Sequence, residues 1–139
     1  MTVSKNQIEL KTGTHSVEDQ CVHSAFFIPP GCPMIDSRMV REHIEALCQF
    51  LDTKVFFMID FTSSECILSF DALKAWGQSG DLNTYRLAEV YVVDSLADLI
   101  FLKQHIRLNK LSYPANVFQS VKQAKDWLGK IGKDHHSPI

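Results

Sequence analysis

The residues best suited to chemistry lie together in one polar segment of the chain. They are Asp60, Thr62, Ser63, Ser64, Ser69 and Asp71. Hydroxyl and carboxylate groups in a loop can bind a small ligand, accept a partner's backbone N–H groups or carry a phosphate. The segment follows a short apolar run, and open α/β sheets place their binding sites in loops after strands. We therefore expect the working surface of this protein here.

Ser69 allows two interpretations. A phosphate on Ser69 would lie at a helix N-terminus, where free N–H groups and the helix dipole favour negative charge. Its charge could release or recruit a partner at a docking surface. Alternatively, Ser69 is only the N-cap, which stabilises the helix by ~1 kcal/mol. The sequence favours the cap, because serine is a preferred capping residue and Asp71 would repel a phosphate.

The first residues of the segment also have a structural explanation. Hydroxyls after a strand often satisfy their own loop backbone, and we favour this role for Thr62, Ser63 and Ser64. A catalytic Asp60 would need a second titratable group close by. Glu65 is nearest in sequence, but no pattern directs it inward. We therefore expect Asp60 to accept hydrogen bonds from loop N–H groups.

The sequence shows no catalytic or metal-binding pattern elsewhere. The histidines are His15, His23, His43, His105, His135 and His136, and their spacing is not that of a ligand set. The cysteines are Cys21, Cys32, Cys48 and Cys66, without a CxxC motif. There is no Gly-rich phosphate loop, nucleophile elbow or HExxH motif. We expect a protein that is not an enzyme and holds no cofactor or metal.

Size and composition indicate one ordinary globular domain. The chain has 139 residues, 45% of them apolar and 22% charged, which is enough to bury a core. A net charge of -2 without a Lys/Arg cluster argues against nucleic acid as a partner. Every apolar run is shorter than the ~18 residues of a membrane span. The first residues lack the apolar core of a signal peptide, so the expected location is the cytoplasm.

Hydrophobic periodicity indicates the elements that position the polar segment. A continuous apolar run over residues 54–61 predicts a strand buried on both faces. Before it, residues 36–51 are expected to form an amphipathic helix capped by Asp36 or Ser37. After it, Ser69 begins a second helix, which ends near one of the next two glycines.

The rest of the chain continues this alternation. Further strands are expected over 7–11, 21–28, 86–93 and 116–118, and further helices from Ser95 and from Ser120 to Gly132. The helix from Ser95 would bury a stripe of Leu96, Leu99, Ile100, Lys103 and Ile106. Residues 12–20 are expected to hold a turn, and 133–139 a flexible tail. This order predicts a single α/β domain with a core over 7–132 and a mixed, mostly parallel sheet of about five strands with about four helices.

Several motifs resemble the SpoIIAA-like (STAS) family, especially its branch grouped with CRAL-TRIO-type lipid-binding domains. Residues 117–128, VFQSVKQAKDWL, are similar to its final strand and helix, and residues 86–90 resemble its R-x-A-x-V strand. Residues 60–71 align without gaps on its pattern D-L-S-x-x-x-x-I-D-S-S-G, which places Ser69 on the serine that anti-sigma-factor antagonists phosphorylate. The chain differs from that pattern at Leu68, Phe70 and Asp71.

The resemblance implies a STAS-like fold over about residues 33–131 and a regulatory role without catalysis. A protein partner would dock on the segment 60–73, including the helix start at Ser69, with phosphorylation as one means of regulation. Homodimerisation is compatible with the sequence, although no motif indicates it. If Trp76, Tyr85 and Tyr113 were exposed together, they would mark a docking patch.

The lipid-binding branch implies an alternative function, the binding of a small apolar ligand. Its pocket would lie between the sheet and the helices and would be lined by Phe57, Met58, Trp76 and Leu102. A pocket of ~300 Å³ or more would occupy much of the core of so small a domain.

Overall fold

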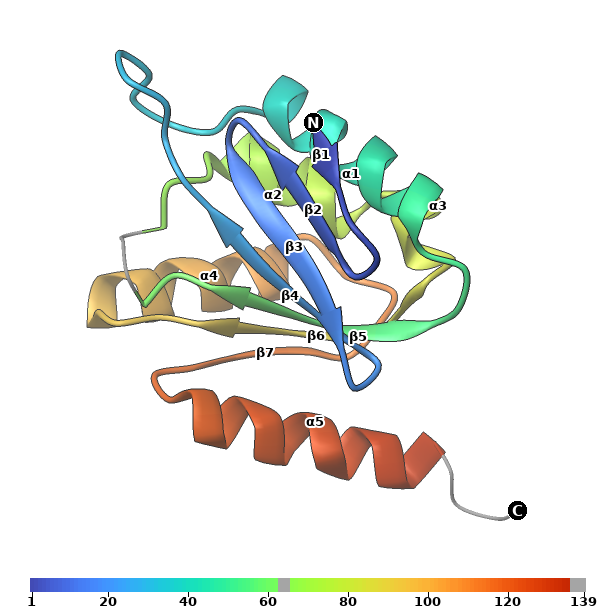
Figure 1. The fold of residues 1–139 in the computed structure, drawn as a ribbon. Coiled ribbons are helices and arrows are strands. Elements are labelled where there is room, and N and C mark those ends of the chain that lie inside the picture. Colours follow the sequence, from blue (N-terminus) through green and yellow to red (C-terminus); the bar gives the residue numbers. More distant parts are fainter. Residues whose placement is uncertain (63–65, 136–139) are drawn as a thin grey trace.

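The strands form one sheet whose order in space is their order in the chain (Figure 1). The computed structural model describes residues 1–62 and 66–135. The strands are β1 (Thr2–Val3), β2 (Gln7–Leu10), β3 (Gly13–Glu18), β4 (Cys21–Phe26), β5 (Val55–Asp60), β6 (Arg86–Val92) and β7 (Ala115–Phe118). The helices are α1 (Ser37–Phe50), α2 (Phe70–Gly77), α3 (Gly80–Asn83), α4 (Leu96–Leu108) and α5 (Val121–His135). These elements confirm the expected single α/β domain.

The two halves of the sheet differ in strand direction. Strands β1 to β4 pair antiparallel, whereas β4 to β7 pair parallel. The sheet is therefore mixed rather than mostly parallel, and the described residues contain seven strands and five helices rather than about five and about four.

Residues 12–20 hold turns at both ends, at Thr12 and at Asp19–Gln20, as expected, but most of that stretch is β3, a strand that the sequence pattern does not predict. Gly13 and His15 are buried there, whereas Thr14 and Ser16 are half-buried on the other face. Side chains alternate between the faces of a strand. A polar stretch can therefore line a core when each inward residue is small or hydrogen-bonded, as His15 is.

Side-chain oxygens cap the helices where the sequence predicts. Asp36 accepts a hydrogen bond from the Met39 N–H at 2.9 Å, and Ser69 and Ser95 each cap their helices at 3.1 Å. The expected end of α5 at Gly132 is wrong, because the helix runs on to His135. A glycine inside a helix costs only ~1 kcal/mol, so it does not have to end one. Of the expected flexible tail, residues 136–139 lie outside the described residues.

The expected buried stripe of α4 is wrong in part, because Leu99 and Ile106 pack against the core but its other members do not. Leu102 and His105 are fully buried, whereas Leu96 is 64% exposed and Ile100 is 51% exposed. Apolar residues occur around most of this helix, so their spacing does not define one inward face. Hydrogen bonds of His105 to its neighbours fix the orientation that is observed.

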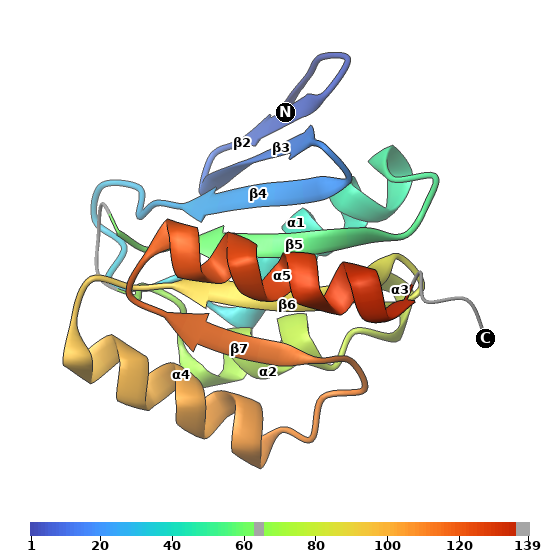
Figure 2. The ribbon, with the colours of Figure 1, turned by 90° about the horizontal axis from the view of Figure 1, so that it is seen from below.

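Helices cover both faces of the sheet. The larger core lies on the face that carries α1, α2 and α4, and includes Phe57, Trp76 and Leu102. The smaller core lies on the opposite face, between the sheet and α5, and includes Met58 and Leu128. Figure 2 shows α5 over the β5–β7 side of the sheet, with β2 to β4 extending beyond it. None of the helices in 1–62 and 66–135 has the length and hydropathy to cross a membrane.

Candidate functional site

The polar segment begins with a closed turn at Asp60. One carboxylate oxygen of Asp60 accepts hydrogen bonds from the N–H of Thr62 at 2.8 Å and from its hydroxyl at 2.6 Å. The structural role expected for Asp60 is therefore confirmed, and Thr62 serves the same turn. Ser63 and Ser64 lie outside the described residues.

Ser69 is the N-cap of α2, as the simpler interpretation predicts. Its hydroxyl accepts a hydrogen bond from the Ala72 N–H, and Asp71 lies exposed in the first turn. Among the described residues, no side-chain hydrogen bond joins Asp60 and Thr62 to Ser69 and Asp71, so these side chains do not form one polar site.

Backbone hydrogen bonds tie this helix start to the Pro-rich loop after β4. Ile35 donates to the carbonyl of Ile67 at 2.8 Å, and Ser69 donates to the carbonyl of Ile35 at 3.0 Å. Ile35 and Leu68 therefore form a short parallel bridge. The bridge places Met34, the residue before Ile35, and Phe70, two residues after Leu68, at the edge of the molecule where α2 begins.

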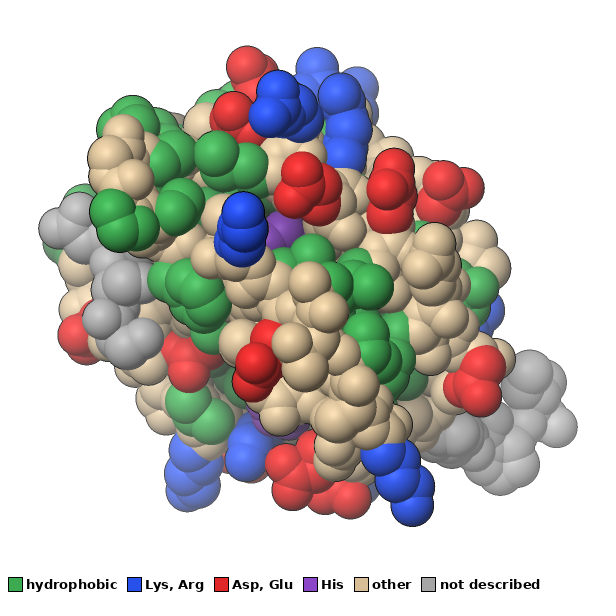
Figure 3. All heavy atoms as spheres, turned by 45° about the horizontal axis from the view of Figure 1, so that its top comes forward, with side chains coloured by type: hydrophobic (Ala, Val, Ile, Leu, Met, Phe, Trp, Pro, Cys, Tyr) green, Lys and Arg blue, Asp and Glu red, His purple; other side chains and the backbone are tan. Residues whose placement is uncertain are grey.

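Exposed apolar side chains gather at this edge. Met34 is 41% exposed and Phe70 is 38% exposed, and the Phe70 ring meets that of Phe101 edge-on at 6.2 Å. Figure 3 shows apolar surface around the loop of residues 27–34, at the upper left. We define the carboxyl-edge patch as Phe27, Met34, Phe70, Leu96 and Ile100, which lie after β4 or near the starts of α1, α2 and α4 and are at least 38% exposed.

Charged residues of both signs lie near the carboxyl-edge patch, and Arg38 in the first turn of α1 is exposed among them. Asp94, two residues after the end of β6, is exposed, as are Asp36 and Asp71 at the starts of α1 and α2. A groove of 610 Å³ between α1 and α2 opens beside it, lined by Ser37 and Asp71 at those helix starts. The groove carries charges of both signs, from Arg41, Glu45, Asp71, Lys74 and Asp81.

A second polar group, buried in the larger core, was missed by sequence reasoning. The Glu89 carboxylate accepts hydrogen bonds from the Trp76 indole at 2.6 Å, the Arg86 guanidinium at 2.9 Å and the hydroxyls of Tyr91 and Tyr113 at 2.8 and 3.2 Å. Arg86 also donates to the carbonyl of Trp76 at 2.7 Å. The group links α2, β6 and the loop before β7. Its sequence signal is Glu89 itself, the one acid within the apolar strand of residues 86–93.

Hydrogen bonds extend this group to α4. Burial, followed by the nearby Glu89, raises the pKa of Tyr91 well above its usual range. Burial also lowers the pKa of His105. Because the Tyr91 hydroxyl donates to Glu89, it accepts from Nε2 of a neutral His105 at 3.2 Å. Nδ1 of His105 then accepts from the Asn109 amide at 2.7 Å. All these side chains are buried, so the group fixes α2 against α4 and offers no surface to a substrate.

A row of hydrogen bonds in the same core joins two histidines that the sequence keeps apart. The row runs from the Thr12 hydroxyl to His43 at 2.6 Å, to His15 at 2.7 Å and to the Ser24 hydroxyl at 2.7 Å. The His15 ring also stacks on Trp76 at 6.2 Å. The signal for His43 was its place on the inward face of α1 between Val40 and Leu47.

The residues expected to line an apolar ligand pocket are divided between the two cores. Phe57, Trp76 and Leu102 are each 0% exposed, and the rings of Phe57 and Trp76 meet at 6.0 Å. Met58 points to the opposite face of β5. Trp76, Tyr85 and Tyr113 do not form an exposed aromatic docking patch, because Trp76 and Tyr113 are buried.

Three cysteine thiols are poor nucleophiles, because burial raises their pKa. Burial raises the pKa of Cys21 to about 11 and that of Cys66 to about 12, and it raises that of Cys48. Protonated thiols are poor nucleophiles and poor metal ligands. Within residues 1–62 and 66–135, no three His, Cys, Asp or Glu side chains gather as a metal site would require.

Comparison with known proteins gives no relative. No protein-family model, no curated protein and no solved structure matches this chain.

Proposed function

We propose that this protein is a non-enzymatic, STAS-like interaction domain that docks a protein partner on the carboxyl-edge patch. The observation that carries the proposal is the exposure of Phe70 and Met34 on either side of the Ile35–Leu68 bridge. An aromatic ring and a methionine at one edge are typical anchors of protein interfaces. The buried Glu89 group supports the proposal, because it holds α2 and α4 in place beneath the anchors.

Three exposed carboxylates near the carboxyl-edge patch favour a protein segment with apolar residues and basic neighbours. Asp36, Asp71 and Asp94 are exposed around the patch. Opposite charges at an interface rim speed association and select among partners. The same carboxylates would repel nucleic acid and the anionic surface of a membrane.

Burial of the polar groups supports a function without catalysis. The Glu89 group and the row of histidines lie within the core, where a substrate would have to displace packed side chains. The thiols of Cys21 and Cys66 stay protonated at neutral pH, because burial raises their pKa.

Ser69 is the place at which docking would be regulated. Its hydroxyl lies at the start of α2, next to the Phe70 anchor. A carboxylate there still favours the helix N-terminus but adds charge beside the apolar anchors. We expect Ser69→Glu to weaken partner binding without unfolding the domain.

A photo-crosslinking experiment in the native cells identifies the partner. A benzophenone side chain at Met34 should give one discrete crosslinked protein, whereas the same group at Leu108 should not. Leu108 is a matched control, because it is 59% exposed at the far end of α4. Equal crosslinking from both positions, or crosslinks only to a second copy of this chain, would contradict the proposed function.

A further inference from the structure

The face of the sheet that carries α5 contains a cleft that the docking function does not use. It has a volume of 380 Å³ and lies between α5, strands β4 and β5, and the turn between β3 and β4. Figure 2 shows that α5 lies toward the β5–β7 side of this face, so the cleft follows the flank of the helix. Its volume falls in the range of small-molecule binding sites.

Two glycines leave space along the side of α5 that lines this cleft. Lys125, Leu128, Gly129 and Gly132 all line it, at the spacing of one helical stripe. A Cβ on Gly129 would meet no atom within 4 Å, and one on Gly132 would lie 3.4 Å from the ring of Phe56. The two missing side chains leave the floor of the cleft open to a ligand.

The floor of the cleft is apolar. Phe56 and Met58 of β5 form it together with Leu128 of α5. Phe56 is half-buried, whereas Met58 and Leu128 are 3% and 6% exposed. Such a floor would bind a short hydrocarbon or aromatic body by removing it from water.

The wall of the cleft offers two hydrogen-bond donors. His23 of β4 is half-buried and Lys125 of α5 is exposed, and both line the cleft. Among the described residues, neither side chain has a hydrogen bond or ion pair. Lys125 lies close enough to Cys21 that its ammonium partly offsets the rise that burial causes in the pKa of that thiol. A carboxylate placed here would have a cation and an imidazole as partners.

Acidic side chains also line the cleft, at its mouth. Glu18 and Asp19 are exposed on the β3–β4 turn, and solvent and salt screen their charge as they screen that of the exposed Lys125. They lie on the strand side of the cleft, and Lys125 lies on the helix side. The half-buried interior is therefore left to the apolar floor and to His23.

We propose that this cleft binds a small amphipathic carboxylate, with its apolar body on Phe56, Met58 and Leu128 and its carboxylate at Lys125 and His23. The proposal does not depend on partner docking, because the cleft and the carboxyl-edge patch share no residue.

Titration of the isotope-labelled protein with octanoate, octanol and octylamine tests the proposal by NMR. We expect octanoate to shift amide signals of β4, β5 and α5, and to bind about tenfold more tightly than octanol. Octylamine should bind more weakly still. Equal binding of octylamine, or shifts confined to the carboxyl-edge patch, would overturn the proposal.

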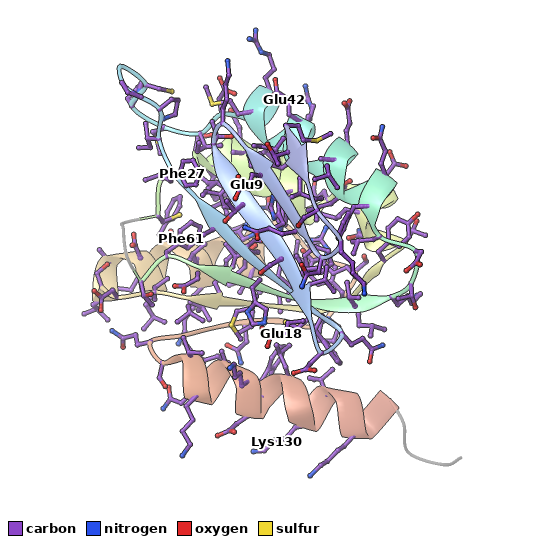
Figure 4. All side chains as sticks on the ribbon, viewed as in Figure 1. Glu9, Glu18, Phe27, Glu42, Phe61 and Lys130 are labelled. Carbon is purple, nitrogen blue, oxygen red and sulfur yellow. The ribbon has the colours of Figure 1, made fainter. Side chains whose placement is uncertain are left out.

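Variants of α5 make the test specific to the cleft. Gly129→Leu places a side chain in open space within the cleft and should abolish octanoate binding. Lys130→Leu is its control, because Figure 4 shows Lys130 on the side of α5 that faces away from the sheet. Lys125→Met should weaken octanoate binding about tenfold and leave octanol binding unchanged. Octanoate binding that survives Gly129→Leu with a native spectrum would overturn the proposal.

Discussion

Nε2 of His15 lies 2.7 Å from Nδ1 of His43, and both rings are at most 1% exposed. Burial lowers the pKa of His15 to about 3, with the neighbouring His43 as a further cause, and burial lowers the pKa of His43 to about 4. Both rings are therefore neutral at pH 7, so each has one donor and one acceptor nitrogen. Every hydrogen bond from Thr12 to Ser24 must then point in the same direction along the row.

This pair makes stability fall as the pH falls. In the unfolded chain each histidine has a pKa near 6.5, so the unfolded state binds more protons than the folded state below that pH. The free energy of unfolding should drop by about 1 kcal/mol per pH unit for each histidine between pH 6 and pH 4. His43→Gln should remove the contribution of one histidine to this dependence of the unfolding free energy on pH, as measured by urea unfolding. His23→Gln is the control, and a slope unchanged by His43→Gln would contradict the explanation.

Removing one partner of the buried ion pair should be costly. Arg86 and Glu89 form a salt bridge of 2.9 Å, and their side chains are fully buried. Arg86→Met should lower the free energy of unfolding by about 3–5 kcal/mol, because it leaves a buried carboxylate without its cation. The double variant Arg86→Met/Glu89→Leu should lose less than the sum of the single variants. Additive losses, measured by urea unfolding, would contradict this account. Glu9→Gln is the control, because it removes the charge of an exposed glutamate (Figure 4).

Ser69 should behave as a helix cap. Ser69→Ala removes the oxygen that accepts from the Ala72 N–H and should cost ~1 kcal/mol of stability. Ser69→Asp should keep the cap and lose less than about 0.5 kcal/mol. Thermal unfolding of both variants separates capping from any effect on docking. Equal stability of the wild type and Ser69→Ala would show that the cap contributes nothing.

Gly13 should tolerate no side chain. A Cβ there would lie 2.6 Å from the carbonyl oxygen of Ala25 and 2.9 Å from Cε1 of His43. Gly13→Ala should destabilise the protein by about 1–3 kcal/mol, because backbone on the neighbouring strand would have to move. Gly80→Ala is the matched control, since a Cβ there meets nothing within 4 Å. Chemical unfolding that shows similar losses for both variants would contradict this packing.

The elements that the sequence predicts well are those whose signal is local. Strand β5 is one continuous apolar run, and Ser69 and Ser95 are favoured caps directly before helices. The closed turn at Asp60 was expected for the same reason, since both of its donors belong to Thr62, two residues further along the chain.

The features that could not be predicted depend on partners far along the chain. The sequence of β3 is too polar to predict a buried strand. Its His15 can be buried because it forms a hydrogen bond with His43, which lies 28 residues away. The inward face of α4 is fixed by bonds between His105 and Tyr91, which periodicity does not contain. The exposure of Leu96 and Ile100, and with it part of the carboxyl-edge patch, follows from that orientation.

Phe70 and Met34 are the proposed anchors of a protein partner. With the crosslinked protein purified, the decisive measurement is its dissociation constant for the wild type, Phe70→Ser, Met34→Ser and Leu108→Ser by calorimetry. Each anchor variant should weaken binding at least tenfold, which corresponds to about 1.4 kcal/mol. Leu108→Ser should bind as the wild type does. Unchanged affinity of both anchor variants, with the fold intact, would contradict the account.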